Sequence, residues 1–343
     1  MNKWRIGLGI IVVLVAMLSL PQFVSNNYTL HVIILSLMYV AFALSFDIAA
    51  GHLGTISLAH PVFFGLGSYT AAILSTRFGI PFWANMLLSM VLAFMLARMI
   101  SIPAFRLRDV SFAIATLGLA LSAQLVVNNW VEVTEGPLCI KGIPRPEISL
   151  LNGTTISIGN QVGNYYLFLA FALFTVFVYI LVTGGRLGRV LTAVRNDETL
   201  AATVGVDVIR YKRFGFLVGA SLAGGIGSLW AQYMTVVCPT NMGIAYTNNL
   251  LIIIFVGGAG ILWGVVTGAI VLTVIPEILR VSPDLRLIIY GFVLLFMVVV
   301  MPKGLAGLLK SAVELKHYKG KPPSQEITAT HQSKEDPKDH APS

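Results

Sequence analysis

A polar segment at residues 184–213, GGRLGRVLTAVRNDETLAATVGVDVIRYKR, holds the side chains best suited to docking another protein. Asn196 or Asp197 can cap a helix there. Glu198 favours its first turn, and Gly205 can end it. The predicted helix has about eight residues, and so short a helix is marginal alone in water because nucleation is unfavourable. Two interpretations stay open: the helix docks on a partner, or it rests on its own chain.

The side chains of this predicted helix suit a close contact. Leu200, Ala201 and Val204 fall on one face, and Ala201 and Ala202 would let a partner approach closely. Six residues of the 184–213 segment are Lys or Arg. The segment is therefore predicted to be a basic loop that presents a short helix.

Motifs for catalysis are absent from the chain. It contains no G-x-x-x-x-G-K-[ST] phosphate loop, no G-x-S-x-G elbow and no H-E-x-x-H helix. His52 and His60 are eight residues apart without a set of Cys or carboxylate partners, so no metal site is expected. We expect no enzyme activity, no cofactor held by this chain and no nucleic-acid partner.

The composition indicates a membrane protein. Of the 343 residues, 56% are hydrophobic and 11% are charged, which excludes an ordinary water-soluble domain. Apolar stretches long enough to cross a hydrocarbon core of about 30 Å predict an all-α, polytopic fold with about ten transmembrane helices. The predicted spans are 6–24, 28–50, 56–76, 82–102, 110–128, 165–183 and 214–234, two crossings within 248–279, and 286–301.

Basic residues beside the spans predict the orientation. Lys3 and Arg5 precede the first span and place the N-terminus in the cytoplasm. The lysine-rich stretch 303–321 places the C-terminus there as well, which requires an even number of spans and favours ten over nine. Arg280 and Arg286 oppose this assignment, because they would lie outside.

The chain is predicted to form one transmembrane domain over residues 1–309, in which 184–213 is a cytoplasmic loop and 129–164 an outer loop. Residues 310–343 carry almost no large apolar side chains and are predicted to be a disordered cytoplasmic tail. The start of the chain is similar to a signal peptide, but no A-x-A-like cleavage site precedes Pro21. We therefore expect a retained first helix.

Glycines interrupt two apolar stretches. GHLG at 51–54 and GGAG at 257–260 would expose backbone polar groups, which at membrane depth is tolerated only inside protein or beside a water-filled cavity. Gly260, Gly264 and Gly268 are spaced four apart and predict a smooth helix face that packs against a neighbour or slides along it. The residues assigned to helix breaks and helix packing are Gly51, Gly54, Gly257, Gly258, Gly260, Gly264 and Gly268.

Few polar side chains lie within the predicted spans. Asp47 falls about one turn from the end of its span, where an end-of-helix carboxylate is a better interpretation than a proton relay. Four uncharged polar residues would either line a translocation path or be satisfied within the helix bundle. They are Ser57, Thr116, Gln124 and Asn249.

The two cysteines, Cys139 and Cys238, both fall in predicted outer loops. An oxidising compartment there would permit a disulfide. The sequence does not supply the distance between them. Two unpaired thiols buried at helix ends are the favoured alternative.

Several segments resemble the permease subunits of branched-chain amino acid ABC importers. Residues 51–72, GHLGTISLAHPVFFGLGSYTAA, resemble the family signature G-x-x-G-x-x-S-L-G-H-x-x-F-F-G-x-G-A-Y. Residues 105–118 resemble its cytoplasmic R-L-R-G and the helix after it, and residues 195–214 resemble its ATPase-coupling loop. The C-terminal motifs G-G-x-G-x-x-x-G and R-P-x-G-L are similar to 257–264 and 301–305. Among the two permease types of such importers, the chain looks more like LivM.

The resemblance implies a multi-pass permease of the bacterial cytoplasmic (inner) membrane. Its implied partners are membrane lipid, a second permease subunit, two ATPase subunits that hold ATP and Mg, and an extracytoplasmic substrate-binding protein. The residues that the resemblance assigns to ATPase coupling are Arg195, Asn196, Asp197, Glu198, Ala201, Ala202 and Gly205.

Departures from the family pattern concern the substrate. Ala59 stands where the family has glycine, Pro61 stands where a small residue is usual, and 134–144 only partly matches the outer T-G-G-x-x-G-L-x-G-I-P. Relatives of the same architecture move urea or short amides, so these substrates stay open beside branched-chain amino acids. A channel or secondary transporter working alone is a further alternative, although the spans carry few of the charges it would need.

Overall fold

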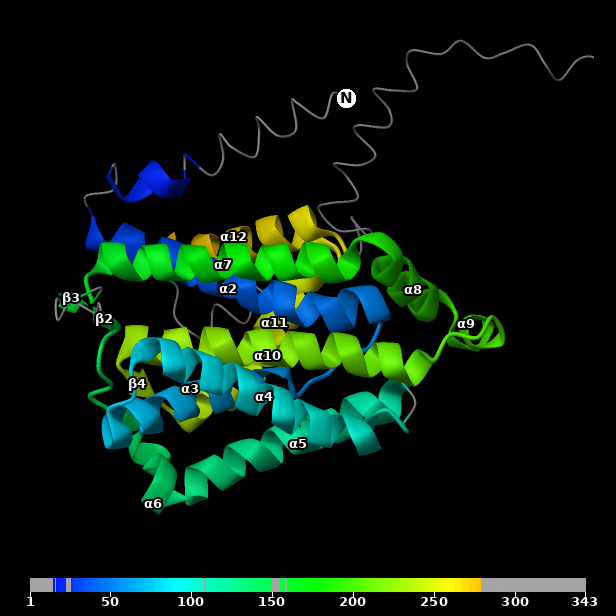
Figure 1. The fold of residues 1–343 in the computed structure, drawn as a ribbon, viewed down its shortest axis with the longest axis horizontal. Coiled ribbons are helices and arrows are strands. Elements are labelled where there is room, and N and C mark those ends of the chain that lie inside the picture. Colours follow the sequence, from blue (N-terminus) through cyan, green and yellow to red (C-terminus); the bar gives the residue numbers. More distant parts are fainter. Residues whose placement is uncertain are drawn as a thin grey trace, which may run out of the picture.

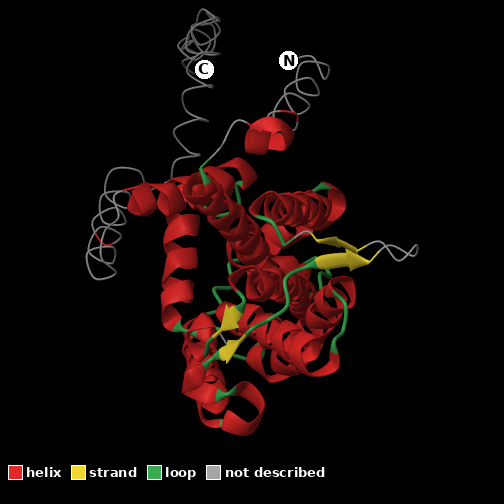
Figure 2. Ribbon diagram, turned by 90° about the vertical axis from the view of Figure 1, so that its left-hand side faces the viewer, coloured by secondary structure: helices red, strands yellow, loops and turns green. Residues whose placement is uncertain are grey.

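The computed structural model describes residues 15, 17–22, 26–107, 109–149, 155–157, 159–278 and 291. Its longest helices lie side by side along one direction (Figure 1), and two pairs of short strands lie at one end of the bundle (Figure 2). The helices are α2 Asn27–Leu53, α3 His60–Phe78, α4 Phe82–Ala104, α5 Asp109–Asn129, α6 Val131–Thr134, η1 Gly136–Leu138, α7 Gln161–Thr183, α8 Gly185–Asn196, α9 Glu198–Thr203, α10 Val208–Met234, η2 Pro239–Met242, α11 Ile244–Gly257 and α12 Leu262–Ile278. The strands are β1 Ile140–Lys141, β2 Glu147–Ser149, β3 Thr155–Ser157 and β4 Val236–Val237.

The predicted spans correspond to helices wherever the structure describes them. Five helices, α2, α4, α5, α7 and α10, are long and apolar enough to cross a membrane, and α11 and α12 are shorter apolar helices. The span predicted at 286–301, most of the one at 6–24 and the tail at 310–343 lie outside the described residues. The all-α, polytopic fold is confirmed, whereas the total of ten crossings stays a prediction.

The long helices differ in how deeply the bundle buries them. In the most apolar window of each helix, 83% of the residues of α2 and 78% of those of α10 are buried, against 22% for α4 and 17% for α5. The outer surfaces of α4 and α5 expose Leu87, Val91, Met95, Leu121 and Leu125. We infer that α4 and α5 face lipid, because an apolar surface of this size is unfavourable in water.

Glycines allow α10 to occupy the centre of the bundle. A methyl group added to Gly219, Gly224 or Gly227 would overlap a backbone carbonyl of α2, α4 or α3, respectively. Only a residue without a Cβ atom permits such close approach. The glycines of α10 therefore serve helix packing on three sides.

The first glycine break starts later than the sequence predicts. α2 continues through Gly51 to Leu53, and Gly54 ends it in the left-handed conformation, with φ 71°. Gly51 is helical and buried, and a side chain there would overlap the carboxyl of Asp47 and the amide of Gly260. The predicted break is therefore correct at Gly54 and wrong at Gly51, which is glycine for reasons of space.

The second break is a turn between α11 and α12. Gly258 and Gly260 have φ angles of 102° and 81°. Added methyl groups on Gly257 and Gly268 would meet the carbonyls of Gly264 and Ile253, so α11 and α12 form an antiparallel hairpin. The prediction that Gly260 shares a smooth helix face with Gly264 and Gly268 is wrong, because Gly260 lies in the turn.

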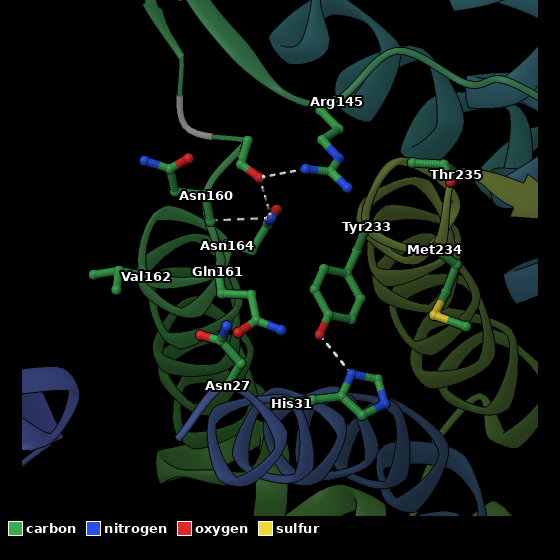
Figure 3. A pocket seen from close by; sticks show the side chains of 11 residues that line it. Asn27, His31, Arg145, Asn160, Gln161, Val162, Asn164, Tyr233, Met234 and Thr235 are labelled. Atoms are coloured by element: carbon green, nitrogen blue, oxygen red, sulfur yellow. Dashed lines mark hydrogen bonds between the residues drawn. The ribbon is translucent and has the colours of Figure 1, made fainter. Parts of the chain in front are cut away.

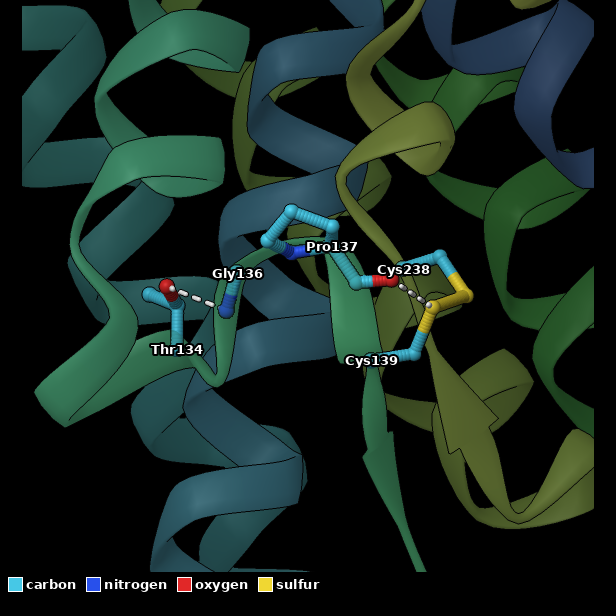
Figure 4. The surroundings of a disulfide bond; sticks show 5 residues. All are labelled: Thr134, Gly136, Pro137, Cys139 and Cys238. Atoms are coloured by element: carbon cyan, nitrogen blue, oxygen red, sulfur yellow. Dashed lines mark hydrogen bonds between the residues drawn. A yellow bond between two sulfur atoms is a disulfide. The ribbon is translucent and has the colours of Figure 1, made fainter.

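A disulfide and a short sheet join two connections at the strand end of the bundle (Figure 4). β1 pairs antiparallel with β4, and the sulfurs of Cys139 and Cys238 are 2.12 Å apart with Cα atoms separated by 4.5 Å. The favoured expectation of two unpaired thiols is wrong, because the β1–β4 pairing brings segments 99 residues apart in sequence side by side. This end of the bundle is called the disulfide end, and the opposite end, with α8 and α9, is called the α9 end (Figure 1).

Candidate functional site

The segment predicted to dock a partner forms two helices at the α9 end (Figure 1). α8 follows α7 directly, and its buried Leu191 and Val194 hold it against the bundle. Asn196 is the last residue of α8, so it does not cap the next helix. Asp197 is the cap of α9, where its carboxylate accepts a hydrogen bond of 2.9 Å from the amide of Leu200.

The six residues of α9 present opposite faces to the bundle and to the surroundings. Ala201 is 4% exposed, whereas Leu200 is 64% exposed and Val204, the residue after the helix, is 75% exposed. The prediction that these three share a face is wrong, because α9 ends after one and a half turns and Ala201 packs inward. Ala202 is exposed, and Gly205, with φ 86°, ends the helix as predicted. Leu200 and Val204 therefore form the apolar surface that α9 offers, although the sequence pattern pointed to Ala201.

One ion pair ties α9 to α10, and a local cap fixes the start of α10. Lys212 on α10 forms an ion pair with Glu198 on α9. Asp207 caps α10 by accepting a hydrogen bond of 3.0 Å from the amide of Arg210. The first residue of α9 is thus held to α10, and the exposed face of α9 is left open.

Arg195, which immediately precedes α9 in the last turn of α8, contacts both glycine breaks. Its Nη1 donates a hydrogen bond to the carbonyl of Gly51. An added Cβ atom on Gly54 would lie 3.4 Å from Cγ of Arg195, and one on Gly260 would lie 3.0 Å from Nη1. The resemblance assigned Arg195 to ATPase coupling, which stays a prediction, and the structure places Arg195 between α9 and the two breaks.

Asp47 connects the same breaks from inside the bundle. It is fully buried near the end of α2, and its Oδ2 accepts a hydrogen bond of 2.6 Å from the hydroxyl of Tyr179 on α7. The amide of Gly260 donates to Oδ1 and Oδ2 at 3.0 and 3.2 Å. Nδ1 of His52 lies 3.8 Å from Oδ2. Burial of a carboxyl group is costly unless such donors surround it. Sequence reasoning missed Tyr179, because no local pattern distinguishes it from other aromatic residues of an apolar span.

The four predicted path residues do not gather in one cavity. The backbone amide of Leu58 donates a hydrogen bond of 3.1 Å to the hydroxyl of Thr116. Leu58 follows the buried Ser57 in the chain, so Ser57 and Thr116 lie close together. The side-chain amide of Asn249 donates a hydrogen bond of 3.1 Å to the hydroxyl of Tyr39 on α2. Gln124 lies farther along α5 toward the disulfide end, where its Nε2 is near Gly243. Thr116 and Asn249 therefore form hydrogen bonds within the bundle, and a role in translocation stays a prediction for all four.

A polar pocket of about 570 Å³ lies at the disulfide end, between the ends of α2, α7 and α10 (Figure 3). Nη1 of Arg145 donates to the carbonyl of Gly159 at 3.3 Å on one side. On the other side, Nδ1 of His31 and the hydroxyl of Tyr233 are 2.6 Å apart. Sequence reasoning did not single out these residues, which come from four separate places in the chain.

The fold and the α9 end together define a multi-pass helical membrane protein with a short helix, α9, at one end of the bundle. Residues 28–298 match the family described as the permease component of the branched-chain amino acid transport system, and the chain belongs to that family. It is a permease subunit of an ATP-binding-cassette importer, and it resides in the bacterial inner membrane.

Curated relatives are similar over most of their length. The chain is 27% identical to the high-affinity branched-chain amino acid transport system permease protein LivM of Escherichia coli K12, over 90% of this chain and 77% of that protein. Identity to LivM of Salmonella typhimurium LT2 is 26%, over 92% and 78% of the two chains. Identity to LivH of the same Salmonella strain is 24%, over 78% and 91%. No solved structure matches the chain.

Proposed function

We propose that this permease subunit moves branched-chain amino acids, or a closely related small substrate, and that α9 docks one of two ATPase subunits. The substrate follows from the names of the relatives, which are described as high-affinity branched-chain amino acid transport proteins. A second permease subunit, a substrate-binding protein outside the membrane and ATPases that hold ATP and Mg²⁺ complete the proposed importer. The α9 end then faces the cytoplasm.

The exposed apolar face of α9 carries the docking assignment. Leu200 projects from a helix of six residues at a polar end of the bundle, and Val204 is the exposed residue after that helix. The basic side chains of Arg189 on α8 and Arg210 on α10 are also exposed. Such a face is unfavourable in water and is expected to be covered by a partner. A partner that buries both side chains would also stabilise a helix too short to persist alone.

Transport would follow from movement of α9 with the ATPase. When two ATPase subunits close on ATP, each would displace the permease helix that it holds. The helices of the two permeases would then tilt against each other, so that a central path opens alternately to the outside and to the cytoplasm. The smooth packing surfaces of α10 and of the α11–α12 hairpin are suited to such movement.

Purification from the native membrane in mild detergent tests the assignment. The wild-type chain is expected to carry ATPase subunits and a second permease in near-equal amounts. A Leu200→Glu, Val204→Glu variant is expected to retain the second permease and lose the ATPases. Leu138→Glu is the matched control, because Leu138 is an equally exposed leucine, 72% exposed, at the disulfide end. Repeated recovery of the wild-type chain alone would contradict the proposal and favour a transporter that works by itself.

Uptake into proteoliposomes that contain the purified complex identifies the substrate. Leucine, isoleucine and valine are expected to compete with one another for ATP-dependent uptake, and urea and short amides are expected not to compete. Uptake of urea with no effect of leucine would assign the chain to the alternative substrate class while leaving the importer intact.

A further inference from the structure

We propose that Asp47, Tyr179 and Arg195 are positioning residues that make both glycine breaks follow the movement of α9. Together with Gly51 and Gly260 they form a cluster, called here the Asp47 junction. The proposal rests on the function proposed above, in which α9 docks an ATPase. It adds that the displacement reaches the bundle through this junction.

Four segments of the chain meet at the Asp47 junction. Asp47 and Gly51 belong to α2, and Tyr179 belongs to α7. Arg195 comes from the last turn of α8, and Gly260 comes from the turn between α11 and α12. The residue pairs in contact are separated by between 132 and 213 positions in sequence. The junction therefore joins the docking segment by side-chain hydrogen bonds to the end of α2, and through Asp47 to α7 and to the turn between α11 and α12.

Arg195 satisfies a carbonyl that the end of α2 leaves without a helical partner. In a continuing helix the amide of residue 55 would donate to the carbonyl of Gly51. Here the amides of Gly54 and Thr55 both turn back to the carbonyl of Ala49. The guanidinium of Arg195 donates to the Gly51 carbonyl instead. If α8 moved without α2, the carbonyl of Gly51 would lose its hydrogen-bond partner, which is unfavourable inside a protein.

Asp47 likewise provides a hydrogen-bond partner for a backbone group at the second break. The φ angle of 81° at Gly260 takes its amide out of any helical ladder, and the carboxyl oxygens of Asp47 accept from that amide. Tyr179 fixes the carboxyl group from the side of α7, through its hydroxyl. Both breaks are thus attached by hydrogen bonds to backbone groups, which leave little choice of geometry.

Packing leaves the junction no free space in which to deform. A methyl group on Gly51 would overlap both Asp47 and the amide of Gly260, and one on Gly260 would lie 3.0 Å from the Gly51 carbonyl and from Nη1 of Arg195. Densely packed protein shifts between discrete arrangements and does not stretch continuously. The junction is therefore expected to move as one body when the ATPase moves α8 and α9.

The matched variants Tyr179→Phe and Tyr165→Phe separate this role from simple stabilisation. Both tyrosines lie on α7 with at most 2% of their surface exposed, and each donates one hydrogen bond of 2.6 Å, Tyr165 to the carbonyl of Met17. Only Tyr179 lies in the Asp47 junction. A purely structural role predicts that the two variants lower the melting temperature similarly and leave coupling unchanged.

The measurement is the number of substrate molecules imported per ATP hydrolysed, in proteoliposomes that contain the complete complex. We expect Tyr179→Phe to lower this ratio about fivefold or more, which is the lower range of coupling between sites, and Tyr165→Phe to leave it unchanged. Adding Arg195→Gln to Tyr179→Phe should lower it little further, because both changes break one unit. A wild-type ratio in Tyr179→Phe, or equal losses in both tyrosine variants, overturns the proposal.

Spin-label distances provide a test that does not depend on the stability of these variants. Labels on Thr199→Cys and Ile261→Cys report α9 against the α11–α12 turn, and labels on Thr199→Cys and Met99→Cys report α9 against α4. Without reductant, Cys139 and Cys238 stay joined and unlabelled. On ATP binding the first distance should stay constant while the second changes, and equal changes in both overturn the junction. Failure of the wild-type chain to bind ATPases would instead contradict the proposed function.

Discussion

The two ends of the bundle are held together by different kinds of bond. At the disulfide end, a covalent bond between Cys139 and Cys238 and the β1–β4 ladder join the connections after α5 and α10. At the α9 end, Arg195 donates a hydrogen bond to the carbonyl of Gly51, and Asp47 accepts one from the amide of Gly260, which joins the corresponding segments. A disulfide joins the two connections until it is reduced, whereas the α9 end is joined by side-chain hydrogen bonds alone. Under the proposal above, the connections at the disulfide end stay in place, and the segments of the Asp47 junction move together as one body.

Loss of the disulfide should have the largest effect on stability. Replacing Cys139 and Cys238 by Ser is expected to lower the free energy of unfolding by about 2 to 4 kcal/mol, because the bond closes a loop of about 100 residues and restricts the unfolded chain. Thermal unfolding in detergent measures the loss. The single variant Cys139→Ser should be as unstable as the double variant, since either removes the same bond. A further loss in the double variant would show that the cysteines act independently.

Gly260→Ala tests the Asp47 junction at the α9 end by adding a methyl group to it. The change is expected to abolish uptake and to cost about 2 kcal/mol of stability, because φ at Gly260 disfavours a Cβ atom and the neighbours at 3.0 Å leave it no room. Gly79→Ala is the control, at the C-terminal end of α3, where φ is 62° and no neighbouring atom lies within 4 Å of the added Cβ atom. That variant should lose only about 1 kcal/mol and keep uptake. Equal behaviour of the two variants would remove the special role given to Gly260.

Gly205→Ala should change function more than stability. Gly205 ends α9 with φ 86°, and an added Cβ atom would meet nothing within 4 Å, so the expected cost is about 1 kcal/mol. We expect uptake to be lost because the end of the docking helix shifts. Gly142→Ala at the disulfide end has φ 71° and the same open space, and it should take up substrate normally. Normal uptake and normal ATPase binding in Gly205→Ala would contradict the docking assignment of α9.

Glu198→Gln should have the smallest effect on stability. The ion pair of Glu198 with Lys212 is partly exposed, and such pairs contribute roughly 0.2 to 1 kcal/mol. If the same carboxylate contacts an ATPase, Glu198→Gln abolishes uptake while Lys212→Gln, which removes the same ion pair, retains most of it. Uptake assays on both variants, at matched amounts in the membrane, decide this. Equal uptake in the two variants would assign Glu198 to the ion pair alone.

Local patterns in the sequence predicted the helices well. Apolar length predicted spans at 82–102 and 110–128, where the structure has α4 and α5, because burial in lipid requires an unbroken apolar helix. The cap at Asp197 and the stop at Gly205 were also readable, since each depends on bonds within a few residues. The additional helix α8 was not predicted, because polar residues interrupt its sequence and no long apolar run marks Leu191 and Val194, the side chains that it buries.

The sequence by itself therefore determined that the chain is a membrane permease and where its long apolar helices lie, whereas docking of a partner by residues 184–213 stays a prediction. Only the tertiary structure decided that Cys139 and Cys238 pair, that Ala201 faces inward, and that Asp47 holds the amide of Gly260. The physical reason is the separation in sequence between the residues that interact. Hydrophobic length and capping act between neighbours in the chain, whereas these contacts join residues up to 213 positions apart and depend on how closely glycines let the helices approach.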